Sequence, residues 1–306
     1  MCHSKNKQIY YYIYENEYNN IYEYNKMETN IIGNKYKLIN KIGSGSFGTI
    51  FEGKNIRTNE KVAIKMELIS DNVKLLKNET IVYKYLHGIK GVPNIKWYGK
   101  DDLYYFMVIE LLGDSLECVL NKNIKLKLKP ILQIGIIILN ILKNIHDRGF
   151  VHRDIKPENF LLTLEKPRKV YIIDFGLSKP YIVKGVHIDY RKKQKFMGTP
   201  DYASINAHNF LEQSRRDDLE CLSYMLIYFY FGTLDWINND IFFLSNEEEN
   251  NYIKNKKELL IQNKDIPFIL MEYHKDTRHL GFNETPDYKK YIELFTSELL
   301  NINECN

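Results

Sequence analysis

Apolar and polar residues alternate along three consecutive segments that begin at residue 36 of this 306-residue chain. The segments are residues 36–42, 49–56 and 61–68, and their period of two is typical of strands with one buried face. A glycine-rich stretch, GSGSFG at 43–48, and a polar turn at 57–60 separate them. The pattern therefore predicts three antiparallel strands joined by short turns.

Helical spacing begins further along the chain. Val73, Leu76, Thr80 and Tyr83 recur on one face of residues 73–86, which predicts a helix. The remaining patterns predict an apolar strand at 104–111, helices at 115–120 and 131–146, and a strand pair within 166–173. Residues 241–265 are so rich in Asn, Glu and Lys that they predict only short helices and loops.

The change from strand patterns to helix patterns near Gly113 predicts an α+β protein with two lobes. The smaller lobe, residues 36–112, is expected to contain an antiparallel sheet with one main helix, and the larger lobe, residues 113–300, to be mostly α-helical. The apolar runs at 131–145 and 222–231 are too short to cross a bilayer, so they predict buried helices.

Composition excludes some classes of protein. Lys and Arg exceed Asp and Glu by only four, 43 against 39, which does not predict nucleic-acid binding. The four cysteines lack CxxC spacing and neighbouring histidines, so they favour a reduced compartment over a metal site. Residues 1–26 lack the pattern of a secretory signal; they are interpreted as a Tyr- and Asn-rich extension, disordered or from a misassigned start.

Residues 151–159, VHRDIKPEN, form a polar segment that proline excludes from a buried helix. Asp154, Lys156 and Asn159 offer a base, a cation and an amide oxygen, and Asp174 follows in the triplet DFG. A charged loop that contains HRD by coincidence is the alternative. Taken together, the two motifs resemble the catalytic loop and the DFG element of protein kinases. That resemblance implies that Asp154 and Lys156 are catalytic and that Asn159 and Asp174 bind Mg²⁺.

The glycine-rich stretch fits the same family. Gly43, Gly45 and Gly48 leave the backbone free to approach phosphates, and a strand follows them where a dinucleotide-binding fold would have a helix. By resemblance, Lys65 of the sequence VAIK contacts the α- and β-phosphates of ATP, and Glu79 orients Lys65. A lysine that ends a strand is otherwise a solvated edge residue.

The strand at 104–111 resembles the one that leads to the hinge between kinase lobes. The backbone at Glu110 and Leu112 is then implied to hydrogen-bond adenine. The apolar residues implied to enclose the nucleotide are Ile42, Ile50, Ala63 and Leu161, with Ile109 as the gatekeeper. Each of these side chains is equally well explained as ordinary core.

Further motifs narrow the resemblance. The chain has KIGSGSFG, ELLGDSLE, the triplet SIN at 204–206 where most kinases have APE, and then SRRDD at 214–218. Together with PDYKKYIELF from Pro286, they resemble the casein kinase I family from about Met27 to Leu300. The resemblance implies a monomeric serine/threonine kinase of the cytoplasm or nucleus that uses ATP and Mg²⁺, modifies Ser or Thr of protein substrates, and binds neither nucleic acid nor membrane.

Two positions depart from that family. Asp201 stands where the family has an Arg that binds a phosphate already present on the substrate, and Asp240 falls near a second family Lys. Carboxylates repel phosphate, so recognition of primed substrates is not expected. A basic cluster on the same segment either is a solvated face or binds an anion or an acidic substrate; it contains Lys184, Arg191, Lys192, Lys193 and Lys195.

Between Asp174 and Asp201 the hydroxyl side chains are Ser178, Tyr181, Tyr190 and Thr199, and none has the look of a regulatory phosphorylation site. The chain is therefore expected to be active without phosphorylation there. Thr199 is expected to support the catalytic loop, and Asp218 to connect a long helix to the HRD backbone. A pseudokinase and a small-molecule phosphotransferase are the rival hypotheses, although the first would lack one of the catalytic groups and the second the full HRDxKxxN pattern.

Overall fold

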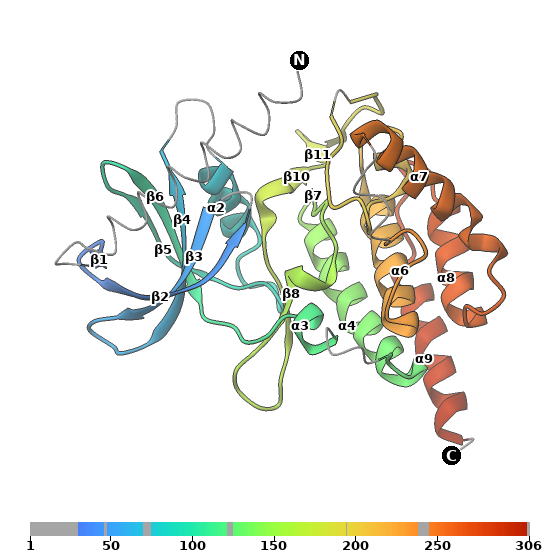
Figure 1. Ribbon diagram of the computed structural model, residues 1–306, viewed down its shortest axis with the longest axis horizontal. Coiled ribbons are helices and arrows are strands. Elements are labelled where there is room, and N and C mark those ends of the chain that lie inside the picture. Colours follow the sequence, from blue (N-terminus) through green and yellow to red (C-terminus); the bar gives the residue numbers. More distant parts are fainter. Residues whose placement is uncertain are drawn as a thin grey trace. The chain divides into compact units, whose positions relative to one another are not determined.

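The computed structural model describes residues 30–45, 48–69, 75–120, 125–193, 195–237 and 245–304. The predictions on residues 1–26 and on Asp240 lie outside this part of the chain. Two compact units can be distinguished (Figure 1): residues up to Lys74 with Lys96–Leu111, and Leu75–Ile95 with Leu112–Asn306. Each unit is described by itself.

The smaller unit is built on an antiparallel sheet of six strands in the order β1-β2-β3-β4-β6-β5. The strands are β1 Ile31–Ile32, β2 Tyr36–Gly45, β3 Gly48–Asn55, β4 Lys61–Leu68, β5 Ile95–Lys100 and β6 Tyr104–Glu110. Every second residue of β3 is buried, as a strand with one covered face requires. Its core includes Phe51, Ile64 and Phe106. The three strands predicted from residue 36 onward and the strand at 104–111 are confirmed.

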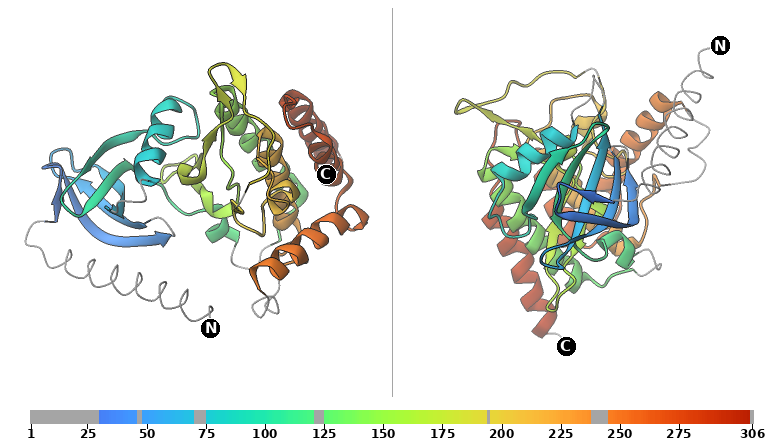
Figure 2. Two further views of the ribbon diagram at one scale, coloured as in Figure 1. Left: turned by 90° about the horizontal axis from the view of Figure 1, so that it is seen from above. Right: turned by 90° about the vertical axis from the view of Figure 1, so that its left-hand side faces the viewer.

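Helices make up most of the larger unit. They are α2 Leu75–Tyr85, α3 Leu116–Leu120, α4 Leu128–Asp147, α5 Ile205–His208, α6 Arg215–Phe231, α7 Asn246–Leu259, α8 Phe268–His279 and α9 Tyr288–Glu304. α4 packs against α6 and α9, and α8 packs against α6 (Figures 1 and 2). The helices predicted at 73–86, 115–120 and 131–146 are confirmed to within a few residues.

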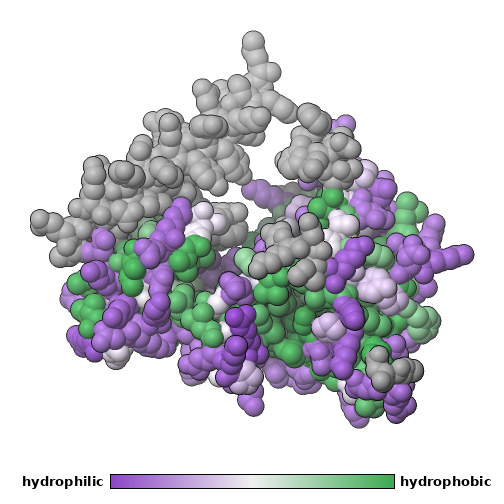
Figure 3. Space-filling view, turned by 60° about the horizontal axis from the view of Figure 1, so that its bottom comes forward, coloured by the Kyte–Doolittle hydropathy of each residue, from purple (hydrophilic) through white to green (hydrophobic). Residues whose placement is uncertain are grey.

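By length and composition alone, α4 is long and apolar enough to cross a membrane. Its 20 residues exceed the apolar run recognised in the sequence because the helix also includes Leu128–Pro130 at one end and His146 and Asp147 at the other. Leu132, Ile138 and Leu142 are completely buried against the neighbouring helices. Core packing therefore accounts for its apolar face, as the sequence predicted. On the face shown in Figure 3, hydrophilic side chains predominate at the periphery, and hydrophobic ones lie between them.

Short strands complete the larger unit, as pairs β7 Phe150–Val151 with β10 Lys179–Pro180, β8 Phe160–Leu162 with β9 Val170–Ile172, and β11 Ile182–Val183 with β12 Val186–His187. The prediction of a strand pair within 166–173 was wrong, because only β9 lies there. Residues 163–169 are the polar connection between β8 and β9, closed by a hydrogen bond from the Thr163 N–H to the Lys169 carbonyl (2.9 Å). Within 241–265, α7 is a 14-residue helix that begins with a capping box of Ser245 and Glu248.

Candidate active site

Asp154 is the centre of the candidate site. Its side chain is almost completely buried, and it accepts hydrogen bonds at both carboxylate oxygens. The Thr199 hydroxyl donates to Oδ1 (2.7 Å), while the Lys156 ammonium (2.9 Å) and the Asn159 amide (3.2 Å) lie at Oδ2. Lys156 also donates to the Thr199 hydroxyl at 2.8 Å. The structure thus brings together a carboxylate and a cation that the sequence predicted to be catalytic.

Asp218, near the start of α6, holds the backbone of the catalytic loop in place. The N–H groups of His152 and Arg153 donate to its two oxygens at 2.7 and 2.8 Å. His146 of α4 lies 2.8 Å from the same carboxylate. Burial by itself would raise the pKa of Asp218, but the hydrogen bond and charge of His146 lower it below the ordinary value. The predicted role of Asp218 is confirmed.

The HRD and DFG motifs each contain one residue with a strained backbone conformation. Arg153 has φ 70° and Asp174 has φ 64°, a left-handed conformation that non-glycine residues rarely adopt. The Arg153 guanidinium donates to the Leu177 carbonyl (2.6 Å), and His152 packs edge-on against Phe175 with ring centroids 5.0 Å apart. These contacts lock the catalytic loop to the DFG segment.

Asn159 and Asp174 provide the oxygens expected of a magnesium site. Asn159 donates from its amide nitrogen to the backbone carbonyl of Asp154 (2.8 Å) and to the Asp154 carboxylate. Because the nitrogen faces Asp154, the amide oxygen of Asn159 is directed away from Asp154. Asp174 accepts from the Gly176 N–H (3.4 Å), and its own N–H lies 3.3 Å from the Tyr83 hydroxyl. Because Mg²⁺ prefers carboxylate and amide oxygens, the donor set fits this ion.

The segment that carries Thr199 has two supports. Gly198 has φ 115°, and a Cβ there would lie 3.0 Å from the Arg153 carbonyl oxygen, so glycine is needed for the close approach to the catalytic loop. Lys257, completely buried, donates to the carbonyls of Pro200 and Ala203, both at 2.7 Å. Burial lowers the pKa of Lys257 to about 7. Thr199 contacts Asp154 as the sequence predicted.

The triplet SIN is a structural element that joins this segment to α6. The Ser204 hydroxyl and the Asn206 amide donate to Asp217 at 2.6 and 3.0 Å. Ser204 also caps α5 by accepting from the Ala207 N–H (3.1 Å). Burial raises the pKa of Asp217 to about 6. SIN therefore fixes the residues that follow Thr199.

In the smaller unit, four predicted nucleotide residues share the face of the sheet opposite the core. Ile50 pairs with Lys65 across β3 and β4, Ala63 lies two residues before Lys65, and Ala63 pairs with Ile109 of β6. Gly43 pairs with Ile50, and Gly45 with Gly48. A Cβ at Gly48 would lie 2.3 Å from the Met66 carbonyl oxygen, which explains glycine at that position.

The other predicted nucleotide residues are divided between the units. Ile42 is half exposed and Glu110 is partly exposed at the end of β6, both in the smaller unit. Leu112, Leu161 and Glu79 belong to the larger unit, where Glu79 is buried on α2. The pairing of Lys65 with Glu79 and the common nucleotide site therefore stay predictions.

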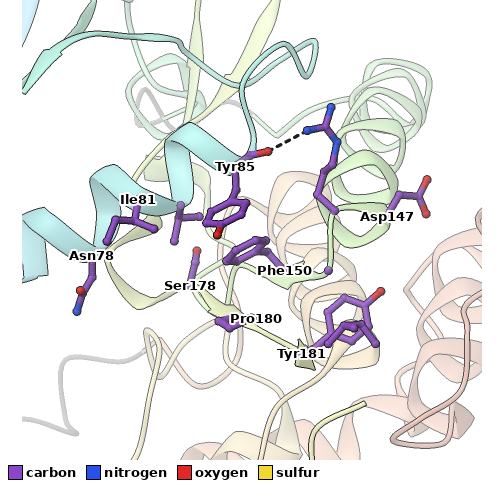
Figure 4. A pocket seen from close by; sticks show the side chains of 12 residues that line it. Asn78, Ile81, Tyr85, Asp147, Phe150, Ser178, Pro180 and Tyr181 are labelled. Carbon is purple, nitrogen blue, oxygen red and sulfur yellow. Dashed lines mark hydrogen bonds between the residues drawn. The ribbon is translucent and has the colours of Figure 1, made fainter. Parts of the chain in front are cut away.

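Three features of the larger unit were not anticipated from the sequence. Glu212 and Lys257 are completely buried charged residues, each with several polar contacts. The third is a pocket of about 650 Å³ between α2, β7 and β10, where Ile81 and Tyr85 face Phe150 and Arg148 donates to the Tyr85 carbonyl at 2.9 Å (Figure 4). Its walls come from separate parts of the sequence, so no local motif indicates it.

Comparison with known families gives the identity of the chain. A family model described as the protein kinase domain matches residues 36–297. The match contains the glycine-rich strands, Lys65, the catalytic loop, the DFG triplet and the helices that fix them. The expected fold is confirmed, because the antiparallel six-stranded sheet and the mainly helical larger unit agree with a bilobal kinase fold. The chain belongs to the protein kinase family, whose members use ATP to phosphorylate proteins.

Proposed function

We propose that this protein is a serine/threonine kinase of the casein kinase I type, which transfers the γ-phosphate of ATP to Ser or Thr hydroxyls. One observation carries the proposal: the Asp154 carboxylate is bound at once by Lys156 and Thr199. A lysine two residues after the catalytic aspartate, joined to a threonine of the following segment, is the arrangement expected of serine/threonine kinases. The SIN and SRRDD motifs support the narrower family.

Each catalytic residue has a distinct task in the transfer. Asp154 orients the substrate hydroxyl and accepts its proton, while the hydroxyl oxygen forms a bond to the γ-phosphorus and the bond to ADP breaks. Lys156 lies 2.9 Å from Asp154 and neutralises charge on the moving phosphoryl group. Lys65 binds the α- and β-phosphates, and Glu79 orients it. The strained backbone at Arg153 and its bonds to Asp218 keep Asp154 in place before the substrate arrives.

Magnesium would be bound by Asn159 and Asp174, whose oxygens suit it. When bound, the ion neutralises negative charge on the ATP phosphates. The Asn159 amide already contacts Asp154, so the same residue sets the distance between the base and the metal position. Substitution of either residue should therefore affect transfer more than folding.

We also propose that the substrate need not be phosphorylated beforehand. Burial raises the pKa of Asp201, while the positive charge of Lys257 partly offsets the rise. Either protonation state lacks the positive charge of the family Arg. Two of the five residues in the basic cluster, Arg191 and Lys193, pair with Glu212, which reduces the charge available for an anionic substrate. Lys184, Lys192 and Lys195 are exposed and remain able to attract acidic side chains.

Three matched serine peptides test both parts of this proposal: one acidic, one with an upstream phosphoserine and one basic. Phosphate transfer from ATP is measured with Mg²⁺ for the wild type and for Asp174→Ala. We expect transfer to unphosphorylated peptides by the wild type and almost none by the variant. Preference for the primed peptide would contradict the proposal on substrates. Absence of transfer despite ATP binding would favour the pseudokinase.

A further inference from the structure

Three cationic side chains converge on one buried carboxylate, that of Glu212. Lys179 Nζ lies 2.9 Å, Lys193 Nζ 2.8 Å and Arg191 Nε 3.2 Å from the same oxygen, Oε2. The Glu212 side chain is completely buried. Its other oxygen, Oε1, is also buried and makes no hydrogen bond within the described residues. A buried charge is costly unless it is paired, so this cluster depends on all its partners.

The partners come from segments that flank the two catalytic motifs. Lys179 lies in β10, which pairs with β7 immediately before the catalytic loop. Arg191 and Lys193 lie on the activation segment, the stretch from Asp174 to Asp201. Two backbone hydrogen bonds fasten that stretch to the Glu212 region: the Glu212 N–H donates to the Arg191 carbonyl (2.8 Å), and the Lys193 N–H donates to the Phe210 carbonyl. Glu212 therefore connects β10, near the start of the activation segment, with the later part of the segment that contains Arg191 and Lys193.

Electrostatics explain why the cluster needs a negative charge. Without the carboxylate, three cations would lie within a few ångströms of one another, with Arg153 of the HRD motif nearby. Burial lowers the pKa of Arg153, and the charge of Glu212 partly restores it. For Glu212, burial alone would raise the pKa, but hydrogen bonds from Lys193 and Lys179 lower it to about 2. The carboxylate is thus ionised throughout the physiological pH range.

Phosphorylation orders the activation loops of many kinases by giving such arginines and lysines an anionic partner. Here the hydroxyls of this segment have other contacts. Ser178 donates to the His152 carbonyl (3.3 Å), Tyr181 to the His146 carbonyl (2.7 Å) and Thr199 to Asp154. The remaining hydroxyl, on Tyr190, belongs to an exposed side chain. The cationic cluster already has its anion in Glu212.

We propose that Glu212 is a positioning residue that takes the place of an activation-loop phosphate and keeps the activation segment ordered. The inference rests on the proposed kinase activity. It gives a physical reason why that activity would not need phosphorylation of the activation segment. Glu212 is completely buried, so it is assigned a positioning role away from the reacting atoms. It acts through Lys179, Arg191 and Lys193 on the segment that carries Thr199.

The test compares the phosphatase-treated full chain with Glu212→Gln, which keeps the side-chain shape and removes its charge. We expect kcat to fall about 5- to 150-fold, the usual range of coupling between distant sites, while the KM for ATP stays close to that of the wild type. Trypsin should also cleave Glu212→Gln faster after Lys192 or Lys195, because the activation segment is less ordered. Glu165→Gln is the matched control, because it makes the same substitution at an exposed glutamate that has no ion pair in the described residues, and it should match the wild type in both assays.

A double variant separates charge from general structural damage. Lys193→Met removes one cation, so combining it with Glu212→Gln should impair kcat less than the product of the two single effects. Equal kcat and equal trypsin cleavage in Glu212→Gln and wild type would overturn the inference, as would a double variant impaired by the full product. An inactive wild type would instead refute the proposed kinase activity, so the two failures are distinguishable.

Discussion

Replacing Thr199 with valine removes one hydroxyl and leaves the shape of the side chain nearly unchanged. That hydroxyl donates to Asp154 at 2.7 Å and accepts from Lys156 at 2.8 Å, so it orients both proposed catalytic groups. Asp154 and Lys156 would still lie together in Thr199→Val, and Asn159 would still bind Asp154. The expected loss is therefore the orientation provided by one hydroxyl, and the loop should keep its backbone contacts.

A hydrogen bond to a charged group contributes about 1.5–3 kcal/mol, which converts to a fall of about 10- to 150-fold in kcat. The KM for ATP should change little, because the Thr199 hydroxyl contacts only Asp154 and Lys156 of the catalytic loop among the contacts described. Thr199→Ser restores the hydroxyl and should retain most of the wild-type turnover. The assay is steady-state phosphate transfer to a serine peptide, with thermal unfolding to verify that each variant is folded. Wild-type turnover in a folded Thr199→Val protein would refute this account of the site.

The supports of the catalytic loop give three more predictions. Asp218→Asn removes the charge that binds His152, Arg153 and His146, so chemical denaturation should show a stability loss of about 3–5 kcal/mol; an unchanged midpoint would contradict this. Gly198→Ala, at φ 115°, should lower kcat clearly and change the melting temperature only slightly. An unaltered kcat would count against the need for Gly198 to approach the Arg153 carbonyl closely. The lowered pKa of Lys257, about 7, means that its burial penalty is full below pH 7 and declines as pH rises toward the ordinary lysine value. Wild type should therefore gain stability relative to Lys257→Met over that rise in pH, and a flat difference would contradict the shift.

Much of the site was visible in the sequence because its chemistry lies in contiguous motifs. The catalytic loop contains Asp154, Lys156 and Asn159 within six residues, so their spacing alone indicates a common site. The strands were predictable because one buried face imposes a period of two. The SIN triplet was recognised as a family feature, but its role in binding Asp217 became evident only from the structure.

Residues whose partners are distant in sequence could not be found in this way. Glu212 has no local signal, because its cationic partners lie between 19 and 33 residues earlier and meet it only in the folded unit. The basic cluster illustrates the same limit: Arg191 and Lys193 pair with Glu212, whereas Lys192 between them has no ion pair among the described residues. Sequence alone could not show which of these three neighbours pair with Glu212.

Lys257 is an intermediate case. It lies in a lysine-rich run, where a solvated face is the ordinary expectation. A signal did exist, because Ile253, Lys257 and Leu260 are spaced four and three residues apart, and all three are buried. This spacing is informative only once the bounds of α7 are known. The Asn-, Glu- and Lys-rich composition of the segment prevented their prediction. The carbonyls of Pro200 and Ala203, which accept hydrogen bonds from the Lys257 ammonium, explain why a lysine is buried on this face of α7.

The central claim is that Asp154 receives the proton of a protein hydroxyl during phosphate transfer from ATP. The most direct test compares wild type and Asp154→Asn for ATP binding and for single-turnover transfer to a serine peptide. The account predicts equal ATP binding and a fall in the transfer rate of about 10²- to 10⁴-fold, the usual contribution of a general base. A folded Asp154→Asn protein that transfers phosphate at the wild-type rate would contradict it.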